Sequence, residues 1–594
     1  MAYDTFVLAA CVTDIKALAV GAKINKIHQP GKHQLLLRFY GKNGQGRLLL
    51  SAEAEAPRAH LTEESPANPA KAPLFLMVAR KWLEGAVLQK IEQTPNERVI
   101  TLGFATKNEV GDPITLMLIV EIMGKHSNII LVDEAGIIID GIRRYDSRLS
   151  RYREVLPQRI YVPPPPQNKI PPPIKDEDEL AESLLQGDWQ DTLAGVLPCR
   201  IAGVSPWLAK EILALAGIRE NLPLEEVGSY ELALLVKQIN AFYRRIETSD
   251  FEPTLLLKGG RPADFAAFVP MLWQGKEHRI FPDMSSALDA YYKARREQTD
   301  FASQQRQLQK PLKHYIERLQ RKISARREEL SLSEQGESYK EAGDLLAAHL
   351  YILLEQAGES GRGLTEVCLP SFAEPTHTVR VGLDAALTPQ QNIQRYYRKY
   401  NKCRKARLAI TERLSAAEEE LTYLQSIEVS ITAAQLLAEL TEIERELTAA
   451  GILLPPKPSS KGKKTAKETL PGLPPRRYTS ADGFTILVGR NNKQNDRLSL
   501  KMAAADDIWL HTQKIPGSHV VIFCAGKEVP DTTITEAASY AAWFSRARES
   551  GKAAVDYTRA GEVKKPAGAK PGMVVYYKQQ TVYIQPKQPP ESEM

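Results

Sequence analysis

The chain has 594 residues and a formal net charge of +6, with 43% apolar and 25% charged residues. A single hydrophobic core does not support this length, so we expect three to five modules of ordinary water-soluble composition. The five cysteines are scattered without a CxxC pair, which argues against a disulfide framework and a zinc site. No segment reaches eighteen uninterrupted apolar residues, and the first residues lack a basic stretch before an apolar one. We therefore expect a cytoplasmic protein without a membrane-spanning helix or a secretory signal.

Residues 1–156 are predicted to form an α+β module. Helical periodicity covers 1–20 and 73–84, and short alternating runs bounded by Gly and Pro predict strands. The predicted strands are Lys23–Ile27, Gln34–Phe39, Arg47–Ser51, Val87–Gln93, Arg98–Phe104, Thr115–Ile122, Asn128–Val132 and Ile137–Ile142. The Pro-rich stretch 157–175 follows and predicts an extended, semi-rigid linker.

A helical region is predicted next, within the segment 176–282. Its Gly203-Val204-Ser205-Pro206 turn followed by a helix resembles a helix-hairpin-helix, in which backbone N–H groups meet a nucleic-acid phosphate. Gly203 and Ser205 are the candidate phosphate-binding residues. A helix capped by Ser205 with Pro206 in its first turn would give the same sequence, so both interpretations stay open.

Two long basic segments, 283–335 and 388–450, carry apolar residues at spacings of three and four, which form one stripe on a helix. The stripes are Leu308, Leu312, Tyr315, Leu319, Ile323 and Leu330, then Tyr396, Tyr400, Leu408, Leu414, Leu421 and Leu424. Neither stripe is wide enough for a globular core, so we expect a long antiparallel coiled-coil arm with 336–387 as a small insert at its tip. Cations on both legs predict a polyanionic partner: Lys313, Arg318, Arg321, Lys322, Arg326, Arg398, Lys399, Lys402 and Lys405.

The stretch 451–475 is rich in Pro, Lys and Ser and predicts a flexible basic linker. Its Gly462-Lys463-Lys464-Thr465 run lacks the first glycine of a phosphate loop, because Lys457 stands there. Residues 476–594 predict an α/β module with strands and a helix at Ile534–Arg548. The strands are Phe484–Val488, Ile508–His511, His519–Phe523, Ala553–Tyr557, Val574–Tyr577 and Thr581–Ile584.

This last module holds a cluster of polar and aromatic residues that comprises Arg490, Asn491, Trp509, His511, Ser518 and His519. Ser518 and His519 are neighbours on a strand and point to opposite faces, which argues against a catalytic triad. A metal site at His511, His519 and Cys524 lacks a further ligand cluster. The cluster favours RNA recognition, with Trp509 or His511 stacking on bases. The alternative for Trp509 is a place in the core.

Six blocks of sequence carry a resemblance to a known family. They are Ile24–Pro30, Val120–Asp133, Leu387–Ala406, Gly489–Ala503, Asp507–Ile522 and Val563–Pro586. In collinear order over nearly the whole chain, they resemble the RqcH/NEMF family of NFACT proteins. The resemblance implies a multidomain α+β protein: an NFACT-N module, a helix-hairpin-helix, a coiled-coil arm with a middle insert, and a C-terminal α/β NFACT-R module.

The resemblance also implies function. Family members bind 50S ribosomal subunits that carry peptidyl-tRNA, recruit aminoacyl-tRNA, and in bacteria direct alanine tailing of the stalled chain. Implied partners are ribosomal RNA, the stalk-base protein, alanine tRNA and the small RNA-binding factor RqcP, with no cofactor and no metal. The family's functional acid corresponds to Asp4, and its Asp-Arg pair corresponds to Glu97 and Arg98, where glutamate is one methylene longer. These three residues are therefore expected to bind tRNA.

Three other functions are weighed against this interpretation. The N-terminal half also resembles formamidopyrimidine-DNA glycosylases, whose chemistry needs an N-terminal proline amine; the chain begins Met1-Ala2. A fibronectin-binding surface adhesin would be expected to carry a signal and an anchor. A generic RNA-binding scaffold would lack the tailing role. We expect a protein that is not an enzyme and that positions tRNA for peptidyl transfer by the ribosome.

Overall fold

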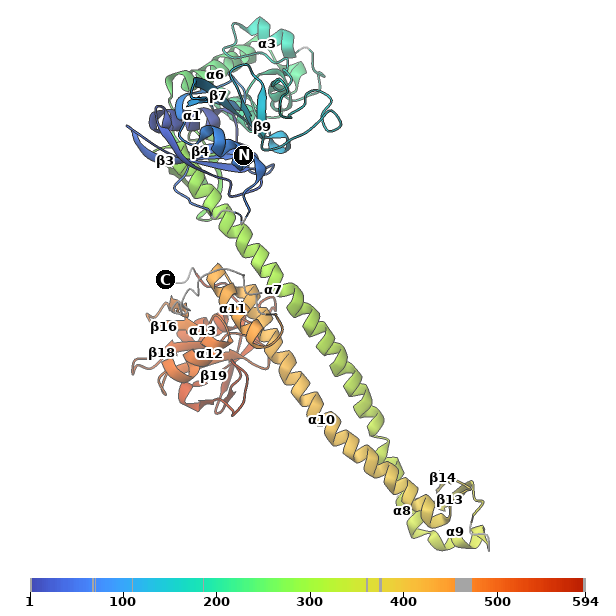
Figure 1. Cartoon of the computed structure of the whole chain (residues 1–594). Helices are drawn as coiled ribbons and strands as arrows, with labels where there is room; N and C mark the ends of the chain where they lie inside the picture. The colour runs from blue at the N-terminus through green and yellow to red at the C-terminus, as the bar shows by residue number, and fades with distance from the viewer. Residues whose placement is uncertain are drawn as a thin grey trace. The chain divides into compact units, whose positions relative to one another are not determined.

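The computed structural model describes residues 3–66, 69, 71–108, 110–184, 186–358, 362–372, 377–454 and 473–590. The chain forms two compact units, residues 1–298 and 299–594, each with hydrophobic clusters of its own (Figure 1). Most of the predicted basic linker, residues 455–472, lies outside the described residues. Within the described ranges, no helix combines the length and the apolar content needed to cross a membrane.

A nine-stranded sheet forms the first part of unit 1, with the order β4-β3-β2-β1-β5-β6-β7-β8-β9 and antiparallel pairing throughout. The predicted strands are confirmed, but β4 was missed because it is short and buries Arg58 and His60 instead of alternating apolar residues. The strands are β1 (Lys23–His28), β2 (Gln34–Gly41), β3 (Gly44–Ser51), β4 (Arg58–Leu61), β5 (Val87–Gln93), β6 (Val99–Lys107), β7 (Pro113–Glu121), β8 (Asn128–Val132) and β9 (Ile138–Gly141).

Helix α1 (Thr5–Ala19) is the central element of this unit. Every residue from Thr5 to Val12 is buried, so the helix is covered on all sides and not on one apolar face. Its Phe6 ring packs edge-on against Phe242 and Tyr243, at centroid distances of 5.6 and 5.2 Å. A second helix, α2 (Leu74–Leu83), packs its buried face against the same core.

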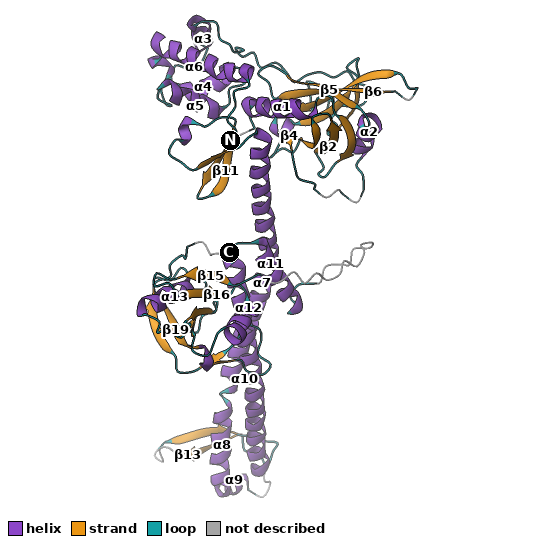
Figure 2. Ribbon diagram, turned by 90° about the vertical axis from the view of Figure 1, so that its left-hand side faces the viewer, coloured by secondary structure: helices purple, strands orange, loops and turns teal. Residues whose placement is uncertain are grey.

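Four helices follow, and Figure 2 shows them gathered together. They are α3 (Glu177–Leu184), α4 (Leu193–Arg200), α5 (Pro206–Ala216) and α6 (Ser229–Thr248). The Pro-rich stretch before them is fastened to the unit: Ile170 N donates to Arg200 O at 2.8 Å, and Ile174 exchanges two hydrogen bonds with Asn240. The segment 176–282 also contains a small sheet that was not predicted, although its Gly259-Gly260 turn is a hairpin signal. This sheet consists of β10 (Thr254–Lys258), β11 (Arg261–Ala266) and β12 (His278–Ile280).

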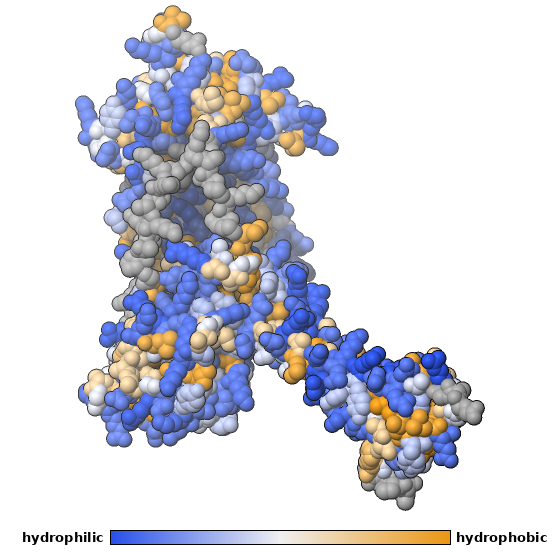
Figure 3. All heavy atoms as spheres, turned by 60° about the horizontal axis from the view of Figure 1, so that its bottom comes forward, coloured by the Kyte–Doolittle hydropathy of each residue, from blue (hydrophilic) through white to orange (hydrophobic). Residues whose placement is uncertain are grey.

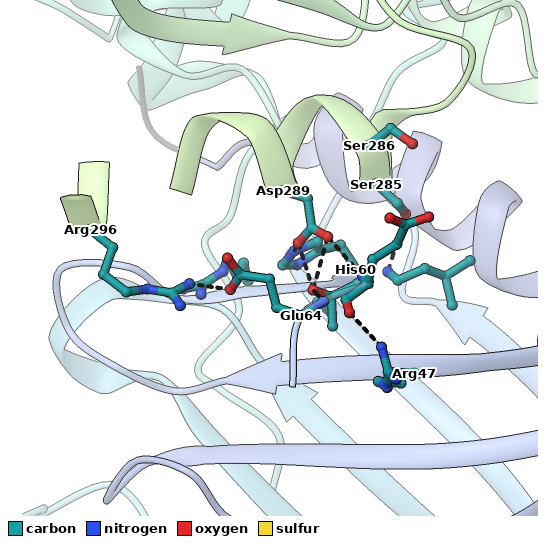
Figure 4. Close-up of polar contacts among 12 residues, drawn as sticks. Arg47, His60, Glu64, Ser285, Ser286, Asp289 and Arg296 are labelled. Atoms are coloured by element: carbon teal, nitrogen blue, oxygen red, sulfur yellow. Dashed lines mark hydrogen bonds and ion pairs between the residues drawn. The ribbon is translucent and has the colours of Figure 1, made fainter. Parts of the chain in front are cut away.

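The first turns of α7 (Met284–Ser333) are anchored to unit 1 by side chains (Figure 4). Asp289 accepts from Thr62 Oγ1 at 2.7 Å and from Glu63 N at 2.9 Å, and it lies 3.1 Å from His60 Nε2. Arg296 forms an ion pair with Glu64 on the same edge of the sheet.

In unit 2, α7 packs against α10 (Pro389–Ala433) through buried Leu308, Leu312, Ile316, Leu319 and Ile323. The pairing is antiparallel, since Gln305 Nε2 donates to Ile431 O and Arg326 Nη1 donates to Arg413 O. Packing of the two predicted legs is confirmed, whereas a coiled-coil supercoil stays a prediction. Leu408 is 69% exposed, and Ile410 takes a buried place instead, so the predicted stripe of the second leg was wrong there.

The predicted second leg is not one helix. It ends at Ala433, continues in extended conformation at Ala434, and resumes as α11 (Leu437–Ala449). Gln435 N donates to Glu439 Oε2 at 2.7 Å, which supplies a side-chain acceptor at the start of α11. The insert between the legs has its own small core and consists of α8 (Gly336–Ala348), α9 (Leu350–Ala357), β13 (Glu366–Pro370) and β14 (Thr378–Gly382).

The C-terminal sheet has the order β15-β16-β18-β17-β19-β22, and α13 (Asp531–Trp543) packs on it through Ala537, Ala538, Ala541 and Ala542 as predicted. Strand β15 was missed because Arg476 and Arg477 obscure it. The remaining elements are β15 (Arg476–Thr479), β16 (Thr485–Val488), α12 (Asn492–Arg497), the π-turn η4 (Leu498–Met502), β17 (Ile508–Thr512), β18 (Val520–Phe523), β19 (Ala553–Arg559), β20 (Val563–Lys564), β21 (Val575–Tyr576) and β22 (Gln580–Ile584).

A buried charge cluster joins α11 to this sheet. Glu439 of α11 lies 3.1 Å from Arg476 Nη2 and also pairs with Arg490, and none of the three side chains is more than 5% exposed. Arg490 Nε donates in addition to Pro474 O at 2.7 Å. Since buried charges are tolerated only when they are paired, this cluster fixes α11 on the sheet.

Replacing Glu439 by alanine is expected to lower the free energy of unfolding of unit 2 by about 3–5 kcal/mol, because two buried guanidinium groups lose their counter-charge. Urea unfolding with hydrogen exchange of the β15–β18 peptides measures this loss. Glu419→Ala, at an exposed position of α10, is the matched control. Equal stability of the two variants would contradict the assignment.

Candidate nucleic-acid interface

The start of α1 is the meeting point of the candidate residues in unit 1. Asp4 is 3% exposed and caps α1, since its Oδ1 accepts from Val7 N at 2.9 Å. A buried helix start leaves N–H groups that need internal acceptors, and Asp4 supplies one.

The turn between β5 and β6 lies beside this helix start. Gln93 Nε2 donates to Thr5 O at 3.3 Å and to Glu97 O at 2.9 Å, which ties the turn to α1. Asn96 adopts a left-handed conformation with φ of 57°, so the chain reverses sharply before Glu97 and Arg98. Arg98 Nη1 donates to Tyr3 O over a long 3.5 Å.

The turn between α4 and α5 closes over the same place. A Cβ atom at Gly203, where φ is +77°, would lie 2.7 Å from Tyr243 Oη, 3.2 Å from Asn96 O and 3.4 Å from Thr5 Oγ1. Tyr243 OH in turn donates to Ala202 O at 2.6 Å. The turn that contains Gly203 therefore lies at the same place as Asp4, Glu97 and Arg98, which were predicted as one set through the family resemblance.

Ser205 serves as the cap of α5, with Leu208 N donating to its Oγ at 3.1 Å and Pro206 in the first turn. This is the capped-helix arrangement that the sequence left open. Phosphate binding by the α4–α5 turn stays a prediction.

The charges of the site influence one another. Burial raises the pKa of Asp4 to about 6, while the N–H groups of Val7 and Phe6 and the guanidinium of Arg98 oppose this shift. Burial raises the pKa of Glu97, opposed by Lys169 and Arg98. Burial lowers the pKa of Arg98 against the pull of Asp4 and Glu97. Arg98 is thus a half-buried cation held between two acids, an arrangement suited to donating hydrogen bonds to a phosphate or a base edge.

The sequence did not indicate Gln93, Lys169 or Tyr243. Gln93 is an ordinary strand residue, and Lys169 belongs to a stretch that was predicted to be a linker. Tyr243 lies more than two hundred residues from Asp4, so only the fold brings it to the site.

The C-terminal cluster is arranged differently from the prediction. Trp509 is fully buried, so its core alternative is the correct one and a stacking role is wrong for this structure. Trp509 Nε1 donates to Ser499 Oγ at 2.9 Å, and Ser499 Oγ lies 2.7 Å from His519 Nδ1. His519 Nε2 lies 3.1 Å from Gly572 O, so both ring nitrogens are engaged and the ring is not placed to bind a metal. Burial, with His511 nearby, lowers the pKa of His519 to about 3, which keeps the ring neutral.

Other members of that cluster also have partners within the protein. Arg490 belongs to the Glu439 cluster, and Asn491 Nδ2 donates to Glu442 Oε2 at 2.7 Å. Ser518 is buried, with its N–H donating to Phe544 O, and half-buried His511 stacks on Trp509. Contact of these residues with tRNA stays a prediction. Among the described residues, no group of three His, Cys, Asp or Glu side chains is placed to hold a metal ion.

The cations predicted on the two legs remain on the surface. Lys313, Arg318, Arg321, Lys322, Arg398, Lys402 and Lys405 are exposed, and Arg326 and Lys399 are half-buried. Lys313 also lines a cavity of about 690 Å³ with Arg306 and Lys310 of α7 and with Arg546 and Arg548 after α13. The cavity contains Glu428 and Glu549, so five cations outnumber two acids, which favours an anionic ligand.

Two family models match the chain. Residues 4–467 match the NFACT N-terminal and middle domains, and residues 475–578 match the NFACT protein RNA binding domain. The chain is therefore an NFACT protein.

Relatives make the assignment more specific. The Rqc2 homolog RqcH of Bacillus subtilis is 34% identical over 587 residues, covering 99% of this chain and 98% of that protein. The Rqc2 homolog RqcH of Streptococcus pneumoniae serotype 2 is 32% identical over 589 residues, with the same coverage. The solved N-terminal part of the fibronectin/fibrinogen-binding protein from Streptococcus suis is 30% identical, with a TM-score of 0.40, and covers 49% of this chain and 99% of that one. The chain belongs to the RqcH/NEMF family.

Gly203→Ala is expected to weaken the contact between the α4–α5 turn and the start of α1. Gly217→Ala is the matched control, because its φ is +70° but nothing lies within 4 Å of an added Cβ. In both variants the left-handed backbone lowers the free energy of unfolding by about 1 kcal/mol. In Gly203→Ala, overpacking should lower it by about 1–3 kcal/mol more. Thermal unfolding of the two variants measures the difference, and equal losses would contradict the contact.

Asp4 is expected to make stability depend on pH. Its folded pKa of about 6 exceeds the value of about 3.9 for an unfolded chain. The folded state then binds more protons between these values, so its stability falls as the pH rises from 4 to 6. Asp4→Asn should remove this loss. Its free energy of unfolding should exceed that of the wild type by about 2–3 kcal/mol at pH 7.5 and equal it at pH 3.5.

Unfolding midpoints at the two pH values test this expectation, with Asp178→Asn at an exposed position as the control. A loss of stability in Asp4→Asn at pH 7.5 would show that the ionised carboxylate stabilises the fold.

Proposed function

We propose that this protein is a ribosome-associated quality control factor. It binds obstructed 50S subunits that carry peptidyl-tRNA, recruits alanyl-tRNA and directs untemplated C-terminal alanine tailing of the stalled chain. The observation that carries this proposal is the similarity to RqcH over 99% of the chain. The match of residues 475–578 to an RNA-binding domain supports an RNA partner.

In this proposal the bond-forming step belongs to the ribosome. The peptidyl-transferase centre joins the amino acids, and the aminoacyl ester supplies the energy. The protein contributes by holding tRNA in place, which lowers the entropic cost of bringing the reactants together. The site around Asp4, Glu97 and Arg98 holds tRNA. The factor works in the cytoplasm with RqcP as a companion.

The two helical legs and the insert bind the ribosomal subunit. The exposed cations of α7 and α10 contact ribosomal RNA, as their charge favours. The insert bears exposed Tyr351, Leu354 and Phe372, at 67%, 45% and 63%, and Figure 3 shows apolar side chains gathered on it. Such a surface suits a protein, and we assign it to the stalk base.

The double substitution Glu97→Ala and Arg98→Ala is expected to reduce tRNA recruitment and alanine tailing at least tenfold. Binding to the 50S subunit should persist through the legs. Pull-down of the tagged chain, sequencing of the bound RNA and immunoblotting of tails measure these effects.

The matched control is Lys90→Ala with Glu92→Ala, an exposed ion pair of 3.2 Å on the adjacent strand β5. Unchanged alanine tails in the Glu97 and Arg98 variant would reject the assignment of those two residues to tRNA binding. A wild-type chain that brings down neither 50S subunits nor tRNA would reject the proposed function.

A further inference from the structure

A cavity of about 520 Å³ lies in unit 1 at the turn between β7 and β8. The sheet is a meander here, so the β5–β6 turn, the β7–β8 turn and the end of β9 share one edge. Ile122 N donates to Arg98 O at 2.9 Å, and the next residue, Met123, already lines the cavity. The cavity therefore lies at the same end of the sheet as the tRNA site proposed above, but on the opposite face. Met123 and Tyr145 pack with the cluster of Val99, whereas α1 packs with the cluster of Ile100.

Arg143, one of the cations that line the cavity, is held in place by hydrogen bonds. Arg143 Nη1 donates to Lys125 O at 2.8 Å, and the backbone of Arg143 exchanges two hydrogen bonds of 3.0 Å with the buried side chain of Asn128. The Nε of Arg143 is buried and has no hydrogen-bond partner among the described residues. Exposed Lys125 and His126, from the turn η1 (Gly124–His126), stand at the rim.

Another part of the lining is apolar and aromatic. It is formed by Tyr145, Leu149, Tyr152, Pro164 and Pro165, and Tyr152 is 54% exposed. Arg153 also reaches the cavity, but its charge is neutralised by Glu121 at 2.6 Å. None of the described lining residues is an acid. Aromatic side chains together with cations suit a flat heterocycle that carries a phosphate.

We propose that this cavity binds one unpaired nucleotide of a single-stranded RNA segment. The base stacks on Tyr152, and its phosphate lies at Lys125 and Arg143. A base within a duplex is already stacked and cannot enter, so the cavity selects loops or single strands. This inference rests on the proposed function, since the strand would continue around this end of the sheet to Arg98.

The full chain provides the test, with a labelled single-stranded RNA of seven nucleotides followed by fluorescence anisotropy. Tyr152→Ala and Lys125→Ala should each weaken binding about fivefold or more. Lys125→Ala should also reduce the slope of log affinity against log salt concentration by about one. Tyr152→Ala should leave this slope unchanged. A blunt RNA duplex should compete poorly.

Two controls are matched to these variants. Tyr40→Ala removes an equally exposed tyrosine (50%) from β2, and Lys107→Ala removes a lysine at the opposite end of β6 from Arg98. Each should change binding less than twofold. Competition with millimolar AMP distinguishes the two sources of the ligand: displacement shows that the cavity accepts a free nucleotide, and no displacement shows that it needs the strand.

Cross-linking locates the nucleotide. RNA with 4-thiouridine should cross-link to the segment 143–153 in the wild-type chain and lose this product in Tyr152→Ala. If both cavity variants bind like their controls while the wild type still brings down tRNA and 50S subunits, the cavity assignment falls and the proposed function stands. If the wild-type chain binds no RNA, both fall.

Discussion

The first unit depends on satisfying the buried start of α1. A helix covered on all sides cannot give its first N–H groups to water, so an acceptor must come from the protein. Asp4 fills that need as a charge, and a charge in such a place requires a counter-charge nearby. Arg98, the hydrogen bonds of Gln93 and the Gly203 turn are all found around this helix start. A cation is thereby held near the surface, in the turn between β5 and β6.

The charges around Asp4 and those around Glu439 differ in how completely they are paired. Arg490 donates to Pro474 O and pairs with Glu439, and it is almost entirely buried. Arg98 is half-buried, and its described hydrogen bond to Tyr3 O is long. A guanidinium carries five N–H donors, so Arg98 retains donors for a ligand where Arg490 is engaged inside the protein. This difference, and not residue type, makes Arg98 the better candidate for contacting a ligand.

Much of the fold could be predicted from local patterns. The alternating strands of the first module, helix α1 and both long legs follow from hydrophobic periodicity. The break of the second leg at Ala434 could not be predicted, since alanine, glutamine and leucine are good helix formers and the break is supported by Glu439 and the docking of α11. Sequence also could not tell whether Arg490, Asn491 and Trp509 face a ligand or a neighbouring helix. Their partners, Glu439, Glu442 and Ser499, are fixed by tertiary packing. The convergence of Asp4, Glu97 and Arg98 was reached through family resemblance, because spacings of nearly one hundred residues carry no local signal.

The Glu439 cluster bears on where the chain can be divided. Judged by composition alone, the natural place to divide the chain is the Pro- and Lys-rich stretch between α11 and β15. Such a cut would leave Arg476 and Arg490 in one fragment and their carboxylate in the other, and Asn492 would lose Glu446 at the same time. The C-terminal RNA-binding domain is therefore not self-contained at its apparent border. A fragment intended to fold alone needs α11 and the end of α10 as well.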